Sequence, residues 1–280
     1  MLKDLKSAYT LRNGVEMPGL GLGVWKVEDE KELIGAVHAA LDVGYIHIDT
    51  AAVYGNEQFV GKAVETSGVK REDLFITTKL WNSHHRFDDA LRAFDDSMKK
   101  LRTDYADLYL IHWPTPRYDD YVEAWRALIR LSEEKRVRAI GVCNFKPAHL
   151  ERLEKETGIV PAVVQVECHP LLQQTELLAY CRGKGIRMEA YSPLLTGHLG
   201  DVADSLEAVA KKHGKTPAQV CIRFQIERGV VVIPKSVHAN RIAENADVFD
   251  FSLDEEDMKT VAALNRDHRF LPDPDTMNYR

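Results

Sequence analysis

Two side chains that can take part in acid–base chemistry lie close together between residues 45 and 57. Apolar and polar residues alternate over 46–49, which predicts a short strand that ends at Asp49. Small residues and a glycine follow, which predicts a loop carrying Tyr54. A carboxylate and a phenol in this arrangement can transfer protons if further charged groups converge on them.

Later strands also end on polar residues. Lys79 follows the apolar stretch 75–78, and His112 follows 108–111. The strand ends further along the chain carry Asn144, Gln165, Glu167, Tyr191 and Lys235. Side chains at the C-terminal ends of strands meet around one mouth when the strands close into a barrel. Whether these residues form one site therefore depends on the elements that hold them.

Strands and helices alternate from about residue 20 onward. Strands are predicted at 20–23, 46–49, 75–79, 106–111, 137–142, 163–167, 187–191 and 230–233. Helices are predicted at 29–43, 56–67, 88–101, 118–134, 147–156, 176–184, 205–213, 217–227, 240–246 and 254–264. With no linker between them, these units favour an α/β fold closed into a single (β/α)8 barrel over 1–280, with extra C-terminal helices. A doubly wound open sheet is the alternative.

Two features near the N-terminus refine this prediction. An Asn13-Gly14 turn predicts a β-hairpin over about 8–18 that caps the barrel. The glycines at 19, 21 and 23 do not form a Gly-x-Gly-x-x-Gly fingerprint, because Val24 stands in place of the third glycine. A dinucleotide would therefore bind without a Rossmann turn.

The polar strand ends make a chemical set with Tyr54. A phenol has a pKa of about 10, and lowering it by 3 units requires about 4 kcal/mol. A cation about 4 Å away supplies that much at an effective dielectric constant of about 20. We expect Lys79 to be this cation, Asp49 to keep it charged, and His112 to hydrogen-bond the oxygen of a bound carbonyl.

These residues and their flanking motifs resemble those of the aldo-keto reductase family over essentially the whole chain, in particular its small bacterial-type glyoxal, methylglyoxal and 2,5-diketogluconate reductases. The resemblance implies an eight-stranded barrel that reduces aldehydes or ketones with NADPH, with Tyr54 as general acid beside Asp49, Lys79 and His112. The motifs are Gly44-Tyr45, 47–51, Tyr54-x-Asn56-Glu57, Lys79-Leu80-Trp81, 107–114 and 141–145.

The same resemblance implies a cofactor site. Lys235, Ser236 and Arg241 match a clamp on the adenosine 2′-phosphate, which favours NADPH over NADH. Asn144 and Gln165 match residues that hold the nicotinamide carboxamide. Cys143 stands where the family usually has serine, and a thiol is a weaker hydrogen-bond partner. The remaining cofactor contacts implied are Tyr191, which stacks on the nicotinamide ring, with Ser192, Leu194, Val237, Glu244 and Asn245.

Three tryptophans are expected to form the carbonyl pocket. Trp25, Trp81 and Trp113 follow predicted strands, and the resemblance assigns aromatic pocket residues to these positions beside His112. An apolar cup around one polar cluster suits a small-molecule substrate. Trp125 lies within a predicted helix and is expected to pack in the core.

Composition excludes several classes of partner. The formal net charge is −6 and neither half of the chain carries a basic block, which argues against nucleic acid and membrane surfaces. No run approaches 18 apolar residues and the first residues lack a signal-like core, so a cytoplasmic protein is expected, by default a monomer. The four cysteines are scattered and are expected to be buried.

Three alternatives remain open. A metal-dependent barrel hydrolase could use His47 and Asp49, with His112, Glu167 and His169 as further ligands, but it leaves Tyr54 and the tryptophans unexplained. We therefore expect no metal and interpret His47 as a structural histidine. A Schiff-base lyase would need Lys79 as an uncharged nucleophile. An NADPH-binding regulatory subunit with little turnover would share the whole barrel.

Overall fold

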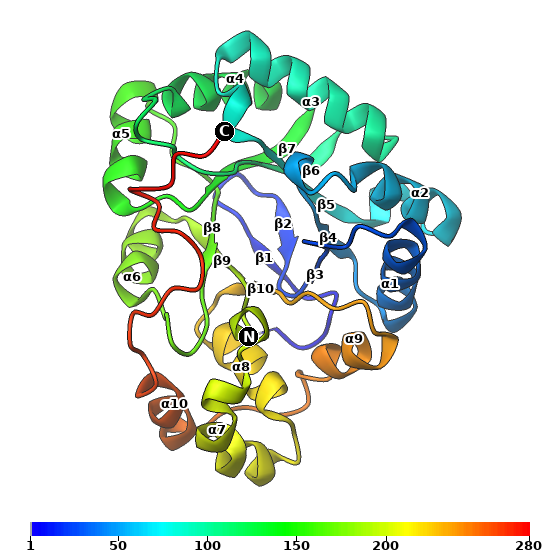
Figure 1. Ribbon diagram of the computed structural model, residues 1–280, viewed down its shortest axis with the longest axis vertical. Coiled ribbons are helices and arrows are strands. Elements are labelled where there is room, and N and C mark those ends of the chain that lie inside the picture. Colours follow the sequence, from blue (N-terminus) through cyan, green and yellow to red (C-terminus); the bar gives the residue numbers. More distant parts are fainter. Residues whose placement is uncertain (1) are drawn as a thin grey trace.

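Eight parallel strands form a barrel at the centre of the computed structural model, which describes residues 2–280 (Figure 1). Met1, the first residue of the predicted domain, lies outside the described residues. The strands neighbour one another in chain order, and parallel bridges from Leu20 to Val232 and from Gly23 to Lys235 join the first to the last. The predicted barrel is confirmed, and the open sheet is wrong. The strands are β3 (Leu22–Gly23), β4 (His47–Asp49), β5 (Phe75–Leu80), β6 (Ala106–Ile111), β7 (Val137–Cys143), β8 (Val163–Glu167), β9 (Arg187–Tyr191) and β10 (Val231–Ile233).

Helices surround the barrel as an outer ring (Figure 1). Their ends follow from local sequence: in α1, the Asp29 side chain accepts from the Glu32 amide at 2.8 Å, and Gly44 ends the helix at φ 109°. Two helices separate β9 from β10, and two more follow β10. The helices are α1 (Glu30–Val43), α2 (Glu57–Ser67), α3 (Phe87–Leu101), α4 (Tyr121–Glu133), α5 (Pro147–Thr157), α6 (Thr175–Lys184), α7 (Gly200–His213), α8 (Pro217–Glu227), α9 (Ala239–Ala246) and α10 (Glu255–Ala262).

The predicted hairpin closes one end of the barrel. Strands β1 (Ala8–Thr10) and β2 (Glu16–Pro18) pair antiparallel. Leu11 and Met17 are buried in a cluster with Phe75, the first residue of β5. The hairpin therefore covers the N-terminal ends of the strands, and the C-terminal ends remain open for the polar residues predicted there.

Two helix starts differ from the sequence-based prediction. Helix α4 begins at Tyr121 rather than near 118, because Asp119 has a left-handed φ of 55° that a right-handed helix excludes. Helix α7 begins at Gly200 rather than near 205. Val202 and Leu206 lie one helical turn apart and are both buried, so the helix extends through a glycine that indicated a loop.

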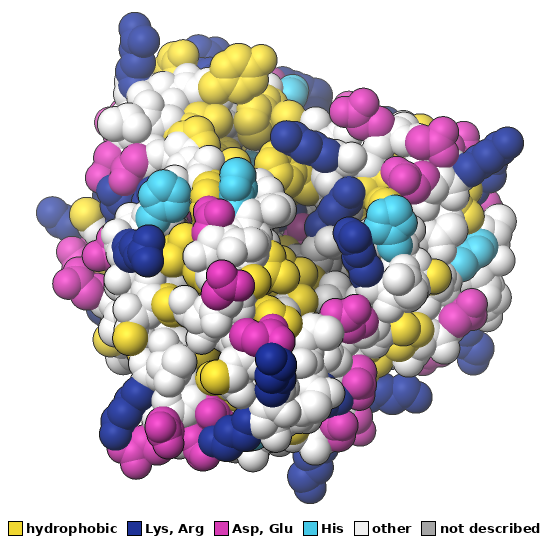
Figure 2. Space-filling view, turned by 60° about the horizontal axis from the view of Figure 1, so that its bottom comes forward, with side chains coloured by type: hydrophobic (Ala, Val, Ile, Leu, Met, Phe, Trp, Pro, Cys, Tyr) yellow, Lys and Arg dark blue, Asp and Glu magenta, His cyan; other side chains and the backbone are white. Residues whose placement is uncertain are grey.

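Burial accounts for the residues expected to be structural. Trp125 is fully buried and its indole nitrogen donates to the Ile159 carbonyl at 3.3 Å. The four cysteines are buried and free, as predicted. Figure 2 shows acidic and basic side chains interspersed over one face, with hydrophobic side chains in a hollow near its centre. Within residues 2–280, no helix is both long and apolar enough to cross a membrane.

Candidate active site

A buried ion pair lies at the C-terminal end of the barrel. Lys79 on β5 donates from Nζ to Asp49 Oδ1 at 2.6 Å and to the Thr50 carbonyl at 2.8 Å. Both side chains are almost fully buried. Adjacent parallel strands β4 and β5 place these side chains on the inner face of the barrel. A short contact to two oxygen acceptors holds the ammonium in one position.

Tyr54 reaches the same ammonium from the loop after β4. Its hydroxyl lies 3.5 Å from Lys79 Nζ. The tyrosine ends a short 3-10 turn, and Gly55 follows with φ 66°. The Asn56 side chain fixes this loop by donating to the Val24 and Val27 carbonyls at 2.9 and 3.1 Å. The phenol is therefore held beside the cation rather than free on a flexible loop.

The expectation that Lys79 lowers the pKa of Tyr54 below its ordinary value is wrong. Burial raises the pKa of Tyr54 to about 12, and the Lys79 ammonium offsets only part of that effect. Burial opposes the charge on Lys79, but Asp49 and Tyr54 raise the pKa of Lys79 above its ordinary value. Burial raises the pKa of Asp49 while Lys79 and Gln165 lower it, and we assign the pair as ionised because of the 2.6 Å contact. Tyr54 thus keeps its proton at neutral pH.

His112 stands on the other side of the phenol. Its ring centroid is 5.8 Å from that of Tyr54 and 5.3 Å from that of Trp81, both in edge arrangements. Burial, followed by the charge on Lys79, holds the pKa of His112 well below its ordinary value. The imidazole is therefore neutral and can donate one N–H to a carbonyl oxygen.

A pocket of about 990 Å³ opens above this cluster. Trp25, Trp81 and Trp113 all line it, together with Tyr54 and His112. The residues predicted as catalytic, cofactor and substrate contacts all line this one pocket except Lys79, which is buried 3.5 Å from the Tyr54 hydroxyl. Glu167, another polar strand end, does not line it either. Lining residues that sequence reasoning missed include Lys26, Glu28, Val53, Pro193, Thr196, Gly197, Leu199, Ala218, Ile233, His238 and Leu271.

Amide and phenol side chains form one wall of the pocket. Asn144 follows β7 with a left-handed φ of 62°, and its Nδ2 donates to the His112 carbonyl at 3.0 Å. The Tyr191 hydroxyl donates to Asn144 Oδ1 at 2.7 Å. Ser192 also has a left-handed φ, 51°, where the chain turns off β9 toward Leu194. These bonds leave each side chain in a single orientation toward the pocket.

The opposite end of the pocket carries positive charge. Lys235 follows β10 and Arg241 lies on α9, and both line the pocket. Over the described part of the chain, 2–280, neither cation has an ion pair or hydrogen-bond partner in the protein. Two unpaired cations beside a helix start fit a phosphate group. Ser236, Val237, Glu244 and Asn245 line the same end.

The barrel interior below the pocket holds a second carboxyl that sequence reasoning missed. Glu189 on β9 is fully buried, and burial followed by the charge on Asp49 raises the pKa of Glu189 to about 8. Side chains two residues apart on a strand point to the same face, so Glu189 points into the barrel as Tyr191 does. The sequence therefore contained the information needed to place Glu189. His47 is fully buried nearby with its pKa lowered to about 3 by burial and Lys79, which confirms it as an uncharged interior residue.

The C-terminal tail, red in Figure 1, runs along one side of the barrel, past α6 and α5 toward α4. Glu167 accepts hydrogen bonds from the Phe270 and Leu271 amides at 2.8 and 3.2 Å, and Leu271 lines the pocket. Further along, the Tyr279 ring lies 6.2 Å from the Trp81 ring. The tail has no periodic pattern, so sequence reasoning had no signal to place it here.

The two carboxylates that the metal-dependent alternative would use are already bonded within the protein. Asp49 binds Lys79 and Gln165, and Glu167 binds the tail and His169. No cluster of three or more His, Cys, Asp or Glu residues suited to a metal occurs among the described residues. Lys79 is held as an ammonium, which removes the uncharged nucleophile that a Schiff-base lyase needs.

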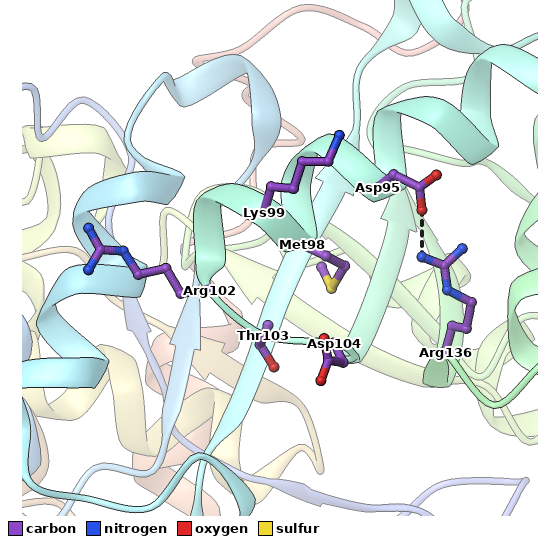
Figure 3. A pocket seen from close by; sticks show the side chains of 7 residues that line it. All are labelled: Asp95, Met98, Lys99, Arg102, Thr103, Asp104 and Arg136. Atoms are coloured by element: carbon purple, nitrogen blue, oxygen red, sulfur yellow. Dashed lines mark hydrogen bonds and ion pairs between the residues drawn. The ribbon is translucent and has the colours of Figure 1, made fainter.

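A second cavity, of about 540 Å³, lies at the other end of the barrel (Figure 3). It lies beside the last turn of α3 and the loop to β6, and its cations are paired with acids. Arg136 binds Asp95 across the cavity, whereas Arg102 points away from it and pairs with Glu65. Because its three cations are each paired and no aromatic side chain among the described residues lines it, the catalytic assignment stays with the larger pocket.

Fold and site together define a (β/α)8 barrel with a tyrosine, lysine, aspartate and histidine cluster at the mouth of an aromatic pocket. The model of the Aldo/keto reductase family matches residues 19–266, and the chain belongs to that family. It is therefore an oxidoreductase that acts on carbonyl and alcohol groups. The resemblance noted in the sequence is confirmed.

Similar proteins cover nearly the whole chain. Glyoxal reductase of Bacillus subtilis (strain 168) is 51% identical over 277 residues, 99% of both chains. Methylglyoxal reductase DkgA of Escherichia coli (strain K12) is 51% identical over 95% of this chain and 96% of its own. The structure of a Gox0644 mutant in complex with NADPH has a TM-score of 0.92 at 42% identity and covers 97% of this chain and 98% of that one. MGS-M4, an aldo-keto reductase from a Medee basin deep-sea metagenome library, gives a TM-score of 0.94 at 45% identity, covering 97% of this chain and 100% of that one.

Proposed function

We propose that this protein reduces small aldehydes and ketones, among them dicarbonyls of the glyoxal and methylglyoxal type, with NADPH as the cofactor. The carrying observation is that Tyr54, Lys79 and Asp49 are bonded in series beneath a pocket of about 990 Å³ walled by aromatic side chains. The names of the two relatives above support the choice of substrate.

The residues present fit the proposed cofactor. Lys235 and Arg241 offer unpaired positive charge, as a 2′-phosphate requires and a 2′-hydroxyl does not. Asn144 and Gln165 offer amides to a carboxamide, and Tyr191 offers a ring for stacking. The NADPH complex of Gox0644 supports this choice.

The chain's own residues move the proton. Bound NADPH supplies a hydride to the carbonyl carbon of the substrate. Tyr54 gives its hydroxyl proton to the carbonyl oxygen, and the Lys79 ammonium at 3.5 Å stabilises the phenolate that remains. Asp49 keeps Lys79 charged and in place. The neutral imidazole of His112 donates an N–H to the carbonyl oxygen and orients it.

The test follows NADPH oxidation with methylglyoxal, nitrobenzaldehyde, aldoses and diketogluconate. Tyr54→Phe removes the acidic proton and keeps the ring, so we expect kcat to fall by about 10²-fold to 10⁴-fold while NADPH binding persists. Wild-type protein that binds NADPH and oxidises it with none of these substrates would contradict the reaction. A Tyr54→Phe variant as active as wild type would contradict only the role of Tyr54.

A further inference from the structure

Both N–H groups of the Gln165 side-chain amide donate hydrogen bonds to carboxyl groups below the pocket. Nε2 donates to Asp49 Oδ2 at 2.8 Å and to Glu189 Oε2 at 2.8 Å. Gln165 on β8 and Glu189 on β9 are directly paired neighbours, so both side chains point into the barrel. Two carboxyl groups from opposite sides thus converge on one amide nitrogen.

This arrangement fixes which end of the amide faces the pocket. Rotating the amide by half a turn would bring its oxygen against the Asp49 carboxylate, which can only accept hydrogen bonds and therefore repels it. The Gln165 oxygen instead receives only the weak Cys143 thiol donor at 3.6 Å. One acceptor position on that oxygen remains, and Gln165 lines the pocket.

The surroundings of Glu189 give it no other function in the site. It is fully buried and lies outside the pocket lining. Its second oxygen, Oε1, has no hydrogen bond and lies 3.7 Å from His47 Nε2. Placing a carboxyl group in a barrel interior is costly unless it bonds to something, and its one hydrogen bond is to Gln165.

We propose that Glu189 is a positioning residue: with Asp49 it holds Gln165 so that only the amide oxygen is presented to the cofactor, as an acceptor for the amino group of the carboxamide. This inference rests on the proposed binding of a nicotinamide cofactor. Glu189 would then select the carboxamide substituent of the nicotinamide ring without touching the ring.

The test compares binding of NADP⁺ with that of its 3-acetylpyridine analogue, in which a methyl group replaces the amino group. Quenching of tryptophan fluorescence reports both affinities without turnover, since three tryptophans line the pocket. Loss of one good hydrogen bond should make the analogue bind wild type about 10-fold more weakly. In Glu189→Leu the freed N–H of Gln165 can rotate toward the ligand and donate to the acetyl oxygen. We therefore expect the ratio of the two dissociation constants, analogue over NADP⁺, to fall at least about threefold.

Two variants make the result specific. Glu189→Gln keeps a carbonyl oxygen that can accept from Gln165, so it should retain the wild-type ratio. Val231→Ala loosens the barrel at the residue paired with Glu189 on β10 without touching Gln165, so it should weaken both ligands equally. Should Glu189→Leu fail to fold, Glu189→Ala removes the same acceptor with less bulk.

The outcomes separate the two claims. A wild-type ratio in the folded Glu189→Leu or Glu189→Ala variant overturns the positioning role and leaves the proposed function intact. An equal fall in Val231→Ala also overturns it, because the effect would then be general loosening. Wild-type protein that fails to bind NADP⁺ overturns both the cofactor and the role of Glu189.

Discussion

The buried carboxyl of Glu189 should make the stability of the protein depend on pH. Its pKa is raised to about 8 from an ordinary value of 4.5, chiefly by burial. Between these values the folded state binds a proton that the unfolded state has lost, so this group's contribution to stability falls as pH rises through the window. Its charged neighbours in the barrel are Asp49 and Lys79, with neutral His47 facing its free oxygen.

Glu189→Gln removes this titration. We expect the difference in free energy of unfolding, variant minus wild type, to increase by at least about 1 kcal/mol between pH 5 and pH 8, because one pKa unit corresponds to about 1.4 kcal/mol. Urea unfolding at several pH values measures it. Glu16→Gln, at an exposed position on β2, is the control and should give a flat difference. A flat difference for Glu189→Gln as well would show that Glu189 is not held protonated.

Individual residues could be predicted where position along a strand decides their direction. Asp49 ends β4, Lys79 is the last residue but one of β5, and His112 directly follows β6. The alternation of side chains along the strands is enough to bring these three together. The pKa of Tyr54 could not be predicted in this way. Its shift depends on burial by loops and neighbouring strands, which outweighs the one cation that the sequence pattern places beside it.

Helix packing makes two helical glycines respond in opposite ways to the same substitution. Gly61 lies on α2 against the end of α3, and a Cβ there would come within 2.5 Å of the Lys100 carbonyl oxygen. Gly35 on α1 has no atom within 4 Å of the equivalent position. We expect Gly61→Ala to destabilise by about 1–3 kcal/mol through forced backbone movement. Gly35→Ala should stabilise by up to about 1 kcal/mol through helix propensity.

Urea unfolding midpoints of the two variants test this pair, each serving as the control for the other. If both midpoints move in the same direction, close contact between α2 and α3 does not limit the residue at 61. Equal slopes of the unfolding curves would show that the shifts reflect stability rather than a change in the unfolded state.

Element boundaries could be predicted where caps or strong turn residues mark them. Pro217 after Thr216 marks the start of α8, and Thr216 accepts from the Gln219 amide as such a start requires. The start of α7 could not be predicted from the sequence, because Gly197 and Gly200 indicate a loop, whereas burial of Val202 stabilises the helix. Tertiary packing decides such cases, and one chain segment does not contain that information.

For the whole molecule, the repeated strand and helix pattern was sufficient to predict a closed barrel. Eight short apolar strands separated by helices leave few other ways to bury both faces of a parallel sheet. The course of the C-terminal tail could not be predicted, since its contacts are with residues far away in sequence. Lys146, for instance, binds Asp273 at 2.7 Å from the loop after β7.

Cofactor binding should stabilise the barrel, because the proposed cofactor site joins residues at or near the ends of four strands, β7 to β10, with helix α9. At a concentration 100 times its dissociation constant, a ligand adds about 2.7 kcal/mol of stability, which is several degrees in melting temperature. We expect NADPH to raise the melting temperature more than NADH at equal concentration, because the proposed role of Lys235 and Arg241 is to bind the extra phosphate. In the double variant Lys235→Ala with Arg241→Ala, this excess should disappear and the smaller NADH effect should remain.

Lys184→Ala, which removes an exposed pair with Glu154 on the outer helices, is the matched control and should keep the excess. Equal losses for NADPH and NADH in the double variant would show that these cations do not select the phosphate.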